Sequence, residues 1–130
     1  MIDKKKLKEA WKLFEKTKVI HMITFDGDNF FCRPMSGVLA DEEVILAATF
    51  RSSKKVAQAG KFGKAAIFLY DPETHHYACL SGTAKVADDK AGRKKLWHED
   101  WGQYYKDGID DKEYVYIKLK VENIDYVTNV

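Results

Sequence analysis

The chain has 130 residues, the size of one ordinary domain, and 45% of them are hydrophobic, which is enough for a single core. Its 22 basic and 20 acidic side chains leave a net charge of +2, which gives no general reason to expect a nucleic-acid partner. The apolar runs are too short to span a membrane and no apolar signal core follows the N-terminal charges, so we expect a cytoplasmic protein without membrane contact.

The first half of the chain predicts a helix and a β-hairpin, followed by a third strand and a short helix. Apolar residues recur at helical spacing over residues 3–17, which indicates an amphipathic helix. Residues 19–25 and 30–40 are rich in strand-forming residues, and the turn residues 26–29 between them predict a hairpin. Residues 44–49 form the third expected strand, and the short helix after it should end near Gly60 or Gly63.

The second half predicts three more strands and one more helix. The continuous apolar centre of residues 64–71 suggests a strand buried on both faces, and a long half-buried strand should begin at His76. Asp88 or Asp89 can cap a helix that runs to about Trp101, and a polar and aromatic connection follows. The last strand alternates strictly from residue 114 to 121, with apolar residues on one face and tyrosines and lysines on the other.

These elements predict a mainly β protein with flanking helices, of the α+β class. Six strands with short hairpin connections do not follow the strand–helix alternation of a parallel sheet, so we expect an antiparallel barrel. The absence of repeats and linkers from the sequence indicates one domain over residues 1–130. Cys32 and Cys79 have no metal-ligand spacing and lie in apolar strand-like contexts, so both are expected to be buried thiols and no metal site is expected.

The most informative segment is Thr49-Phe50-Arg51-Ser52-Ser53-Lys54-Lys55, which joins a strand to a helix start. The N-terminus of a helix carries a partial positive charge and prefers acidic side chains, yet this segment holds three cations and no carboxylate. Hydroxyl groups, free backbone N–H groups and ammonium groups together suit a bound phosphate. The alternative from this segment alone is that Ser53 is an ordinary N-cap and the lysines form a solvated face.

Arg33 is the second candidate, because it stands inside an otherwise apolar strand where an unpaired guanidinium would be costly to bury. Pro34 cannot donate a hydrogen bond to a neighbouring strand, so this part of the strand should be an edge, a bulge or a place where a ligand approaches. A surface arginine beside an edge-strand proline is the alternative.

The order and spacing of several short motifs resemble the general stress protein branch of the pyridoxamine 5′-phosphate oxidase-like flavoproteins. These motifs are Arg33-Pro34-Met35, Thr49-x-x-x-Ser53-x-Lys55, Ser81-Gly82-Thr83-Ala84 with Asp88-Asp89, Leu96-Trp97 and Gly108-x-Asp110. The resemblance implies a six-stranded split β-barrel that forms a homodimer and binds FMN at the subunit interface.

Carried over by position, the resemblance assigns two groups of cofactor-binding residues. The FMN phosphate would be held by Arg33, Ser53, Lys54 and Lys55. The ribityl chain and isoalloxazine ring would lie along Pro34, Met35, Ser36 and Thr49, with Trp101 reaching the flavin from the other subunit. Trp97 and Trp101 are one helical turn apart, a spacing more typical of core or dimer packing than of a flavin contact.

The resemblance implies a flavin-dependent oxidoreductase that exchanges electrons with a small-molecule donor or acceptor. Because the chain lacks the C-terminal extension that carries a Trp and an Arg in pyridoxamine 5′-phosphate oxidase, we do not expect oxidation of pyridoxamine phosphate. No catalytic side chain is assigned, because a flavin supplies the reactive atoms itself. The alternative is a module that binds or senses FMN, a deazaflavin, pyridoxal phosphate or haem; haem would require an axial ligand such as His21, His75 or His76.

Overall fold

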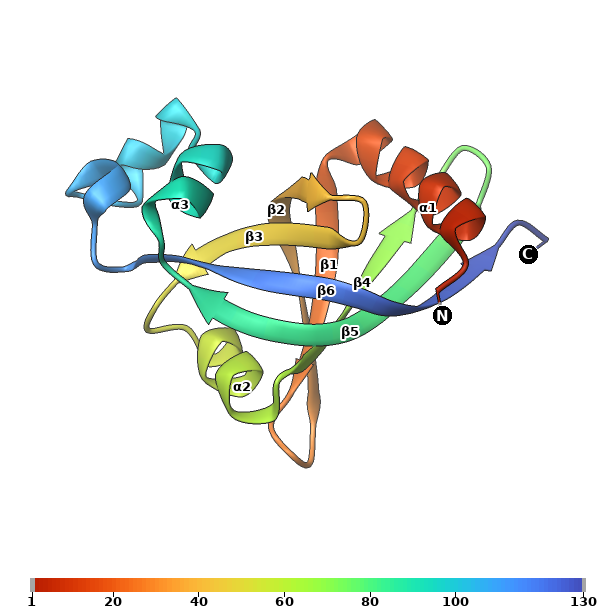
Figure 1. Ribbon diagram of the computed structural model, residues 1–130, viewed down its shortest axis with the longest axis horizontal. Helices are drawn as coiled ribbons and strands as arrows, with labels where there is room; N and C mark the ends of the chain where they lie inside the picture. Colours follow the sequence, from red (N-terminus) through yellow and green to blue (C-terminus); the bar gives the residue numbers. More distant parts are fainter. Residues whose placement is uncertain (1, 130) are drawn as a thin grey trace.

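Six antiparallel strands close into a barrel in the computed structural model, which describes residues 2–129. The strands are β1 (Val19–Phe25), β2 (Phe30–Asp41), β3 (Val44–Phe50), β4 (Lys64–Tyr70), β5 (Tyr77–Ala87) and β6 (Tyr114–Val127). They pair in the order β1, β2, β3, β6, β5, β4 (Figure 1). The sequence-based prediction of a six-stranded antiparallel barrel with flanking helices is therefore confirmed.

Three α-helices flank the barrel: α1 (Lys4–Thr17), α2 (Lys54–Phe62) and α3 (Lys90–Leu96). The N-cap of α1 is Asp3, and the helix buries its apolar stripe against β4, β5 and β6. The stripe joins the inward-facing side chains of the strands in the main core. Figure 1 shows α2 beside the β1–β2 hairpin, at the opposite end of the barrel from α1. No helix among residues 2–129 is long and apolar enough to cross a membrane.

A second core lies outside the barrel, between its outer face and the excursion from β5 to β6. This excursion contains α3 and two short 3₁₀ helices, η1 (Glu99–Gln103) and η2 (Gly108–Asp110). It buries Tyr114 and Tyr116, whose hydroxyl groups donate hydrogen bonds to Arg93 O and to the Asp89 carboxylate. The alternation of β6 is as predicted, but its outer tyrosines are buried because the excursion folds back over them.

Three sequence-based predictions are wrong in detail. The helix α3 ends at Leu96 instead of near Trp101, because Trp97 leaves the helical conformation and packs against Tyr114 in the second core. Cys32 is exposed because it lies on the outer face of β2, while Cys79 is partly buried. The strand β4 is buried on only one face, because its other face carries half-exposed side chains.

The ladder between β2 and β3 opens at one end of the barrel. The two strands pair from Gly37 and Ala47 onward, toward the turn that joins them. On the other side of this point, residues 30–36 pair only with β1 and residues 48–50 pair only with β6. We call the space between residues 34–36 and 48–50 the β2–β3 gap. It leaves one free edge on each strand, and α2 begins just beyond β3 at the same end of the molecule (Figure 1).

Candidate functional site

The centre of the candidate site is a pair of cations, Arg33 on β2 and Lys55 in the first turn of α2. Arg33 takes an inward position in the alternation of β2, and burial lowers the pKa of its guanidinium. Burial also lowers the pKa of Lys55, and the positive charge of Arg33 lowers it further, so the two side chains repel each other. Neither cation forms an ion pair with a carboxylate among residues 2–129. A bound anion would neutralise both.

The other two cations near the start of α2 have acidic neighbours. Arg51 donates to the Asp88 carboxylate over 2.8 Å and to Lys112 O over 2.8 Å, so it ties β3 to the later part of the chain. Lys54 is exposed, and its charge acts on the Asp26 carboxylate at the hairpin turn. Backbone N–H groups lower the pKa of the Asp26 carboxyl, and the charge of Lys54 adds to this effect. The charge of Lys55 therefore acts on Arg33, while that of Lys54 acts on Asp26, and the role of Lys54 at a phosphate stays a prediction.

The start of α2 offers hydrogen-bond donors beside this pair. Ser53 is the N-cap residue, but its side chain makes no capping hydrogen bond, and its hydroxyl lies 3.4 Å from the hydroxyl of the buried Thr49. The N–H groups of Lys54 and Lys55 have no acceptor in the described part of the chain. Free N–H groups at a helix N-terminus attract anions. The predicted residues Thr49 and Ser53 thus have neighbouring hydroxyl groups at the start of α2, where the charge of Lys55 acts on Arg33.

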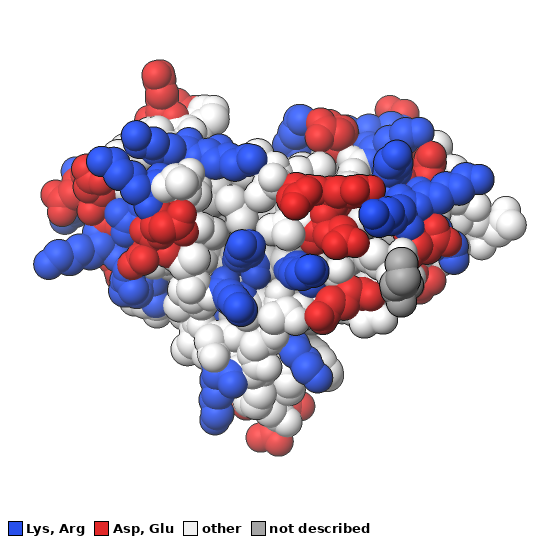
Figure 2. Space-filling view, in the orientation of Figure 1, with Lys and Arg blue, Asp and Glu red and all other residues white. Residues whose placement is uncertain are grey.

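One carboxylate does approach this helix start, and the local sequence could not reveal it. Glu113, which lies 61 residues later in the chain, accepts a hydrogen bond from Ser52 N over 3.1 Å. It satisfies the N–H group one residue before the N-cap and leaves the first turn of α2 free. The chain as a whole is nearly balanced, with a net charge of +2, and Figure 2 shows both basic and acidic side chains on the face that it draws.

A groove on the outer face of the barrel continues from the β2–β3 gap. It has a volume of about 300 Å³, and we call it the outer groove; it is lined by Pro34, Ser36, Ala48, Phe50, Trp101, Tyr104 and Tyr105. The Tyr105 hydroxyl donates to Thr49 O over 2.8 Å, which ties the excursion to the end of β3. Burial raises the pKa of Tyr105 to about 12, which keeps the hydroxyl a donor.

The predicted ring-binding residues divide between the groove and the core. Pro34 and Ser36 point outward into the outer groove, whereas the side chain of Met35 points into the main core. Trp101 packs edge-on against Trp97 with ring centroids 6.1 Å apart, and it also lines the groove of its own chain. The contact of Trp101 with a flavin on the partner subunit stays a prediction.

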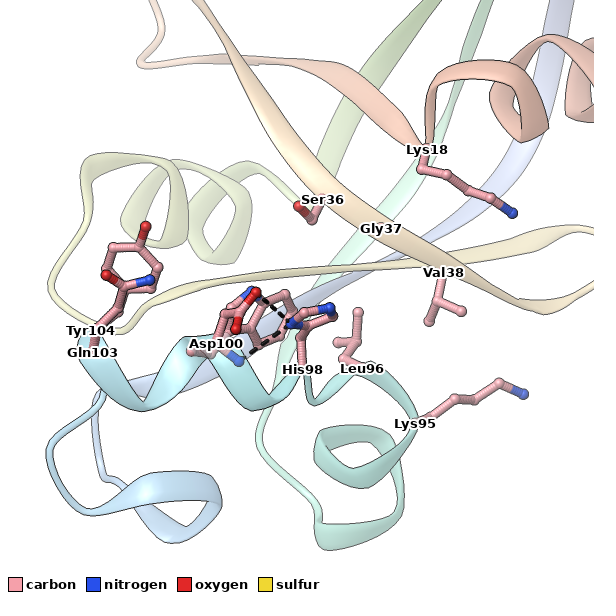
Figure 3. A pocket seen from close by; sticks show the side chains of 11 residues that line it. Lys18, Ser36, Gly37, Val38, Lys95, Leu96, His98, Asp100, Gln103 and Tyr104 are labelled. Carbon is pink, nitrogen blue, oxygen red and sulfur yellow. Dashed lines mark hydrogen bonds and ion pairs between the residues drawn. The ribbon is translucent and has the colours of Figure 1, made fainter.

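A second groove of about 510 Å³ adjoins the outer groove and shares Ser36, Trp101 and Tyr104 with it. Lys18 and Lys95 stand on opposite sides of this second groove (Figure 3). Both ammonium groups already have partners, since Lys18 binds the Glu15 carboxylate and Lys95 donates to Ala40 O over 3.3 Å. The lysines of this groove are therefore a weaker anion site than Arg33 and Lys55.

Sequence reasoning missed two polar residues that lie directly beneath the cation pair. The Thr24 hydroxyl accepts a hydrogen bond from Arg33 over 2.8 Å and donates one to Gln58 over 2.5 Å. Thr24 is 1% exposed and Gln58 is 8% exposed. Thr24 occupies an inward position in the alternation of β1, which could have marked it as a buried polar group. Nothing in the sequence connects it to Gln58, 34 residues away.

The histidines do not form a metal or base constellation in the described part of the chain. No group of three His, Cys, Asp or Glu side chains among residues 2–129 could hold a metal ion. His75 is within 2.6 Å of the Tyr70 hydroxyl at a turn, and His98 accepts a hydrogen bond from Asp100 N. His21 lies opposite Pro34 in the β1–β2 ladder and is exposed on the outer face.

Comparisons with known proteins agree with this fold and cover nearly the whole chain. The profile of a family described as "Pyridoxamine 5′-phosphate oxidase like" matches residues 4–129. A protein from Clostridium acetobutylicum, related to general stress protein 26 of Bacillus subtilis, has 25% identity and a TM-score of 0.83, over 98% of this chain and 91% of that chain. No curated protein matches the sequence.

Two further solved structures are similar in fold. General stress protein 26 from Bacillus anthracis has 20% identity and a TM-score of 0.81, over 93% of this chain and 92% of that chain. The general stress FMN/FAD binding protein from Xanthomonas citri has 18% identity and a TM-score of 0.82, over 98% of this chain and 92% of that chain. At this level of identity, the two structures show the shared split-barrel fold.

Proposed function

The chain belongs to the pyridoxamine 5′-phosphate oxidase-like family, and from this premise we propose that it binds FMN and acts as a flavin-dependent oxidoreductase. The observation that carries the proposal is the Arg33–Lys55 pair, two half-buried cations that repel each other and have no carboxylate partner among residues 2–129. The similar protein from Xanthomonas citri is named as an FMN/FAD binding protein, which supports a flavin.

The phosphate of FMN fits the chemistry at the start of α2. Arg33 and Lys55 would donate charge-assisted hydrogen bonds, and the Ser53 hydroxyl and the free N–H groups of the first turn would complete the shell. These donors come from two elements, β2 and α2, and together they would suit a terminal phosphate with three free oxygens. A diphosphate inside a longer cofactor such as FAD offers fewer oxygens and less charge at any one point.

The remainder of the cofactor would pass through the β2–β3 gap into the outer groove. The ribityl chain would lie along Met35 and Thr49, in the gap between the free edges of β2 and β3. The isoalloxazine ring would lie along Pro34 and Ser36, and Trp101 would contact the flavin of the partner subunit across the dimer interface. Apolar and aromatic walls with a few polar groups are typical of cofactor pockets.

When bound, FMN supplies the electron-transfer chemistry, and the chain supplies position and electrostatics. Arg33 and Lys55 would fix the phosphate end, the strand edges would orient the ring, and the aromatic side chains of the outer groove would shield the ring from water. We assign no catalytic side chain. The reaction partner is an unidentified small molecule.

We also propose that the protein is a homodimer with the flavin site at the interface. Large apolar side chains are exposed near the gap, with Phe50 38% exposed and Tyr104 58% exposed, and Phe30 on the β1–β2 hairpin is 76% exposed. Such surface is commonly covered by a second copy of the chain. Light scattering at micromolar concentration with FMN present should give twice the mass of one chain, which is 15.0 kDa. A monomer under these conditions would contradict the interface model.

An absorbance spectrum of the freshly purified protein tests the cofactor, and a reduction assay tests the enzyme. Flavin bands that bleach with a reduced nicotinamide and return when an acceptor such as a quinone is added would support the oxidoreductase. Flavin bands that no nicotinamide and no acceptor changes would favour a binding or sensing module. A Soret band lost in His21→Ala would identify haem and overturn the proposal.

A further inference from the structure

Beneath the proposed phosphate site, a hydrogen-bonded chain of three polar side chains connects two strands and a helix. Arg33 Nη1 on β2 lies 2.8 Å from Thr24 Oγ1 on β1, and Thr24 Oγ1 lies 2.5 Å from Gln58 Oε1 on α2. Thr24 and Gln58 are almost fully buried, among the few buried polar residues of the described chain. Burying a hydroxyl or an amide costs free energy unless it is hydrogen-bonded, so these two hydrogen bonds offset the cost of burying Thr24 and Gln58.

The chemistry of the three groups fixes the direction of each hydrogen bond. A guanidinium can only donate, so Thr24 Oγ1 must accept the hydrogen bond from Arg33. The single O–H of Thr24 is then available to donate, and the acceptor within reach is the carbonyl oxygen of the Gln58 side chain. The hydrogen bond to Gln58 therefore fixes the orientation of the Thr24 hydroxyl, and the Thr24 oxygen in turn accepts the hydrogen bond that positions Arg33.

The same helix carries both ends of the arrangement. Lys55 and Gln58 are three residues apart on α2, so their side chains lie on one face of the helix. At the helix start, the positive charge of Lys55 repels that of Arg33. One turn later, Gln58 accepts a hydrogen bond from Thr24, which itself accepts one from Arg33. The guanidinium is thereby kept at a defined position although the positive charge of Lys55 repels it.

We propose that Thr24 and Gln58 are positioning residues that hold Arg33 in place for the phosphate of the bound cofactor. The proposal rests on the proposed FMN site, because it concerns how that site is organised before the ligand arrives. An Arg33 that has lost the Thr24 hydroxyl can turn toward solvent, since its side chain is only partly buried. Binding must then restore its position, which costs affinity for phosphate-bearing ligands only.

The test compares FMN with riboflavin, which has the same ring and no phosphate, by fluorescence titration of the cofactor-free protein. Thr24→Val removes the hydroxyl but keeps the shape of the side chain and a strand-forming residue. We expect it to weaken FMN binding about fivefold to tenfold and to leave riboflavin binding unchanged. Thr24→Ser keeps the hydroxyl and should restore FMN binding, which loss of packing would not explain. Gln58→Leu should weaken FMN binding in the same selective way.

A double-mutant cycle with Arg33→Met separates the positioning role from the phosphate site itself. If Thr24 acts through Arg33, Thr24→Val should change FMN affinity by less than about twofold once Arg33 is methionine. Equal weakening of FMN and riboflavin by Thr24→Val, or full weakening in the Arg33→Met background, would overturn the positioning role. If Arg33→Met itself leaves the preference for FMN over riboflavin unchanged, the phosphate site of the proposed function is wrong.

Discussion

Replacement of Lys55 by methionine tests the proposed phosphate site with two effects of opposite sign. Methionine keeps the unbranched, apolar part of the side chain and removes the charge. With FMN bound, the change removes one charge-assisted hydrogen bond to the phosphate, worth about 1.5 to 3 kcal/mol. That corresponds to roughly a tenfold to hundredfold loss of FMN affinity. Without a ligand, the same change removes the repulsion between Lys55 and Arg33.

The cofactor-free variant should therefore be as stable as the parent protein or slightly more stable, while it binds FMN more weakly. Chemical denaturation measures the first quantity and flavin fluorescence titration the second. Lys61→Met is the matched control, because Lys61 is an exposed lysine in the last turn of the same helix, next to the Phe62 ring. The reasoning is refuted if Lys55→Met binds FMN as tightly as the parent, or if Lys61→Met loses as much affinity.

Three further predictions concern stability and the ring end of the site. Gly82→Ala should destabilise the barrel by about 2 to 3 kcal/mol, because the new Cβ would stand 1.9 Å from a backbone carbonyl of β6. At Gly60 on α2 a new Cβ would meet nothing within 4 Å, so Gly60→Ala should raise the free energy of unfolding by about 0.5 to 1 kcal/mol. Chemical denaturation of both variants measures these changes, and similar values for the two would contradict the prediction. The hydrogen bond from Lys16 lowers the pKa of Asp71 to about 2 from its ordinary 3.8. The ionised Asp71 therefore contributes to the stability of the fold above pH 3.8, and this contribution is lost as the pH falls toward 2. Asp71→Asn should remove that part of the pH dependence of unfolding, and an unchanged dependence would show that the carboxylate is not its source. Trp101→Ala should reduce the quenching of flavin fluorescence and weaken FMN and riboflavin alike; unchanged quenching and affinity would make Trp101 ordinary packing.

Local patterns in the sequence predicted the elements of the barrel well. The strict alternation of β6 and the turn residues after Phe25 depend only on neighbouring residues, and both are found where expected. The end of α3 was misplaced because it depends on distant partners. Trp97 leaves the helix to pack against Tyr114, and no short-range signal specifies that contact.

The candidate site was predictable in its residues but not in its arrangement. The sequence placed three cations at the start of α2, yet it could not show that Arg51 is paired with Asp88, 37 residues away. It also could not show where the β2–β3 ladder opens, because pairing is a property of two strands at once. The hydrogen bond between Thr24 and Gln58 was equally unpredictable, because it joins residues of two different elements and neither residue is unusual in its own segment.

The central claim is that a phosphate-bearing flavin binds with its phosphate at Arg33 and Lys55. Titration of the cofactor-free protein with FMN and with riboflavin, in parallel and at fixed salt, tests it most directly. Two charged donors at about 1.5 kcal/mol each predict that FMN binds at least about a hundredfold more tightly than riboflavin. Equal affinity for the two flavins, or no binding of either, would contradict the claim.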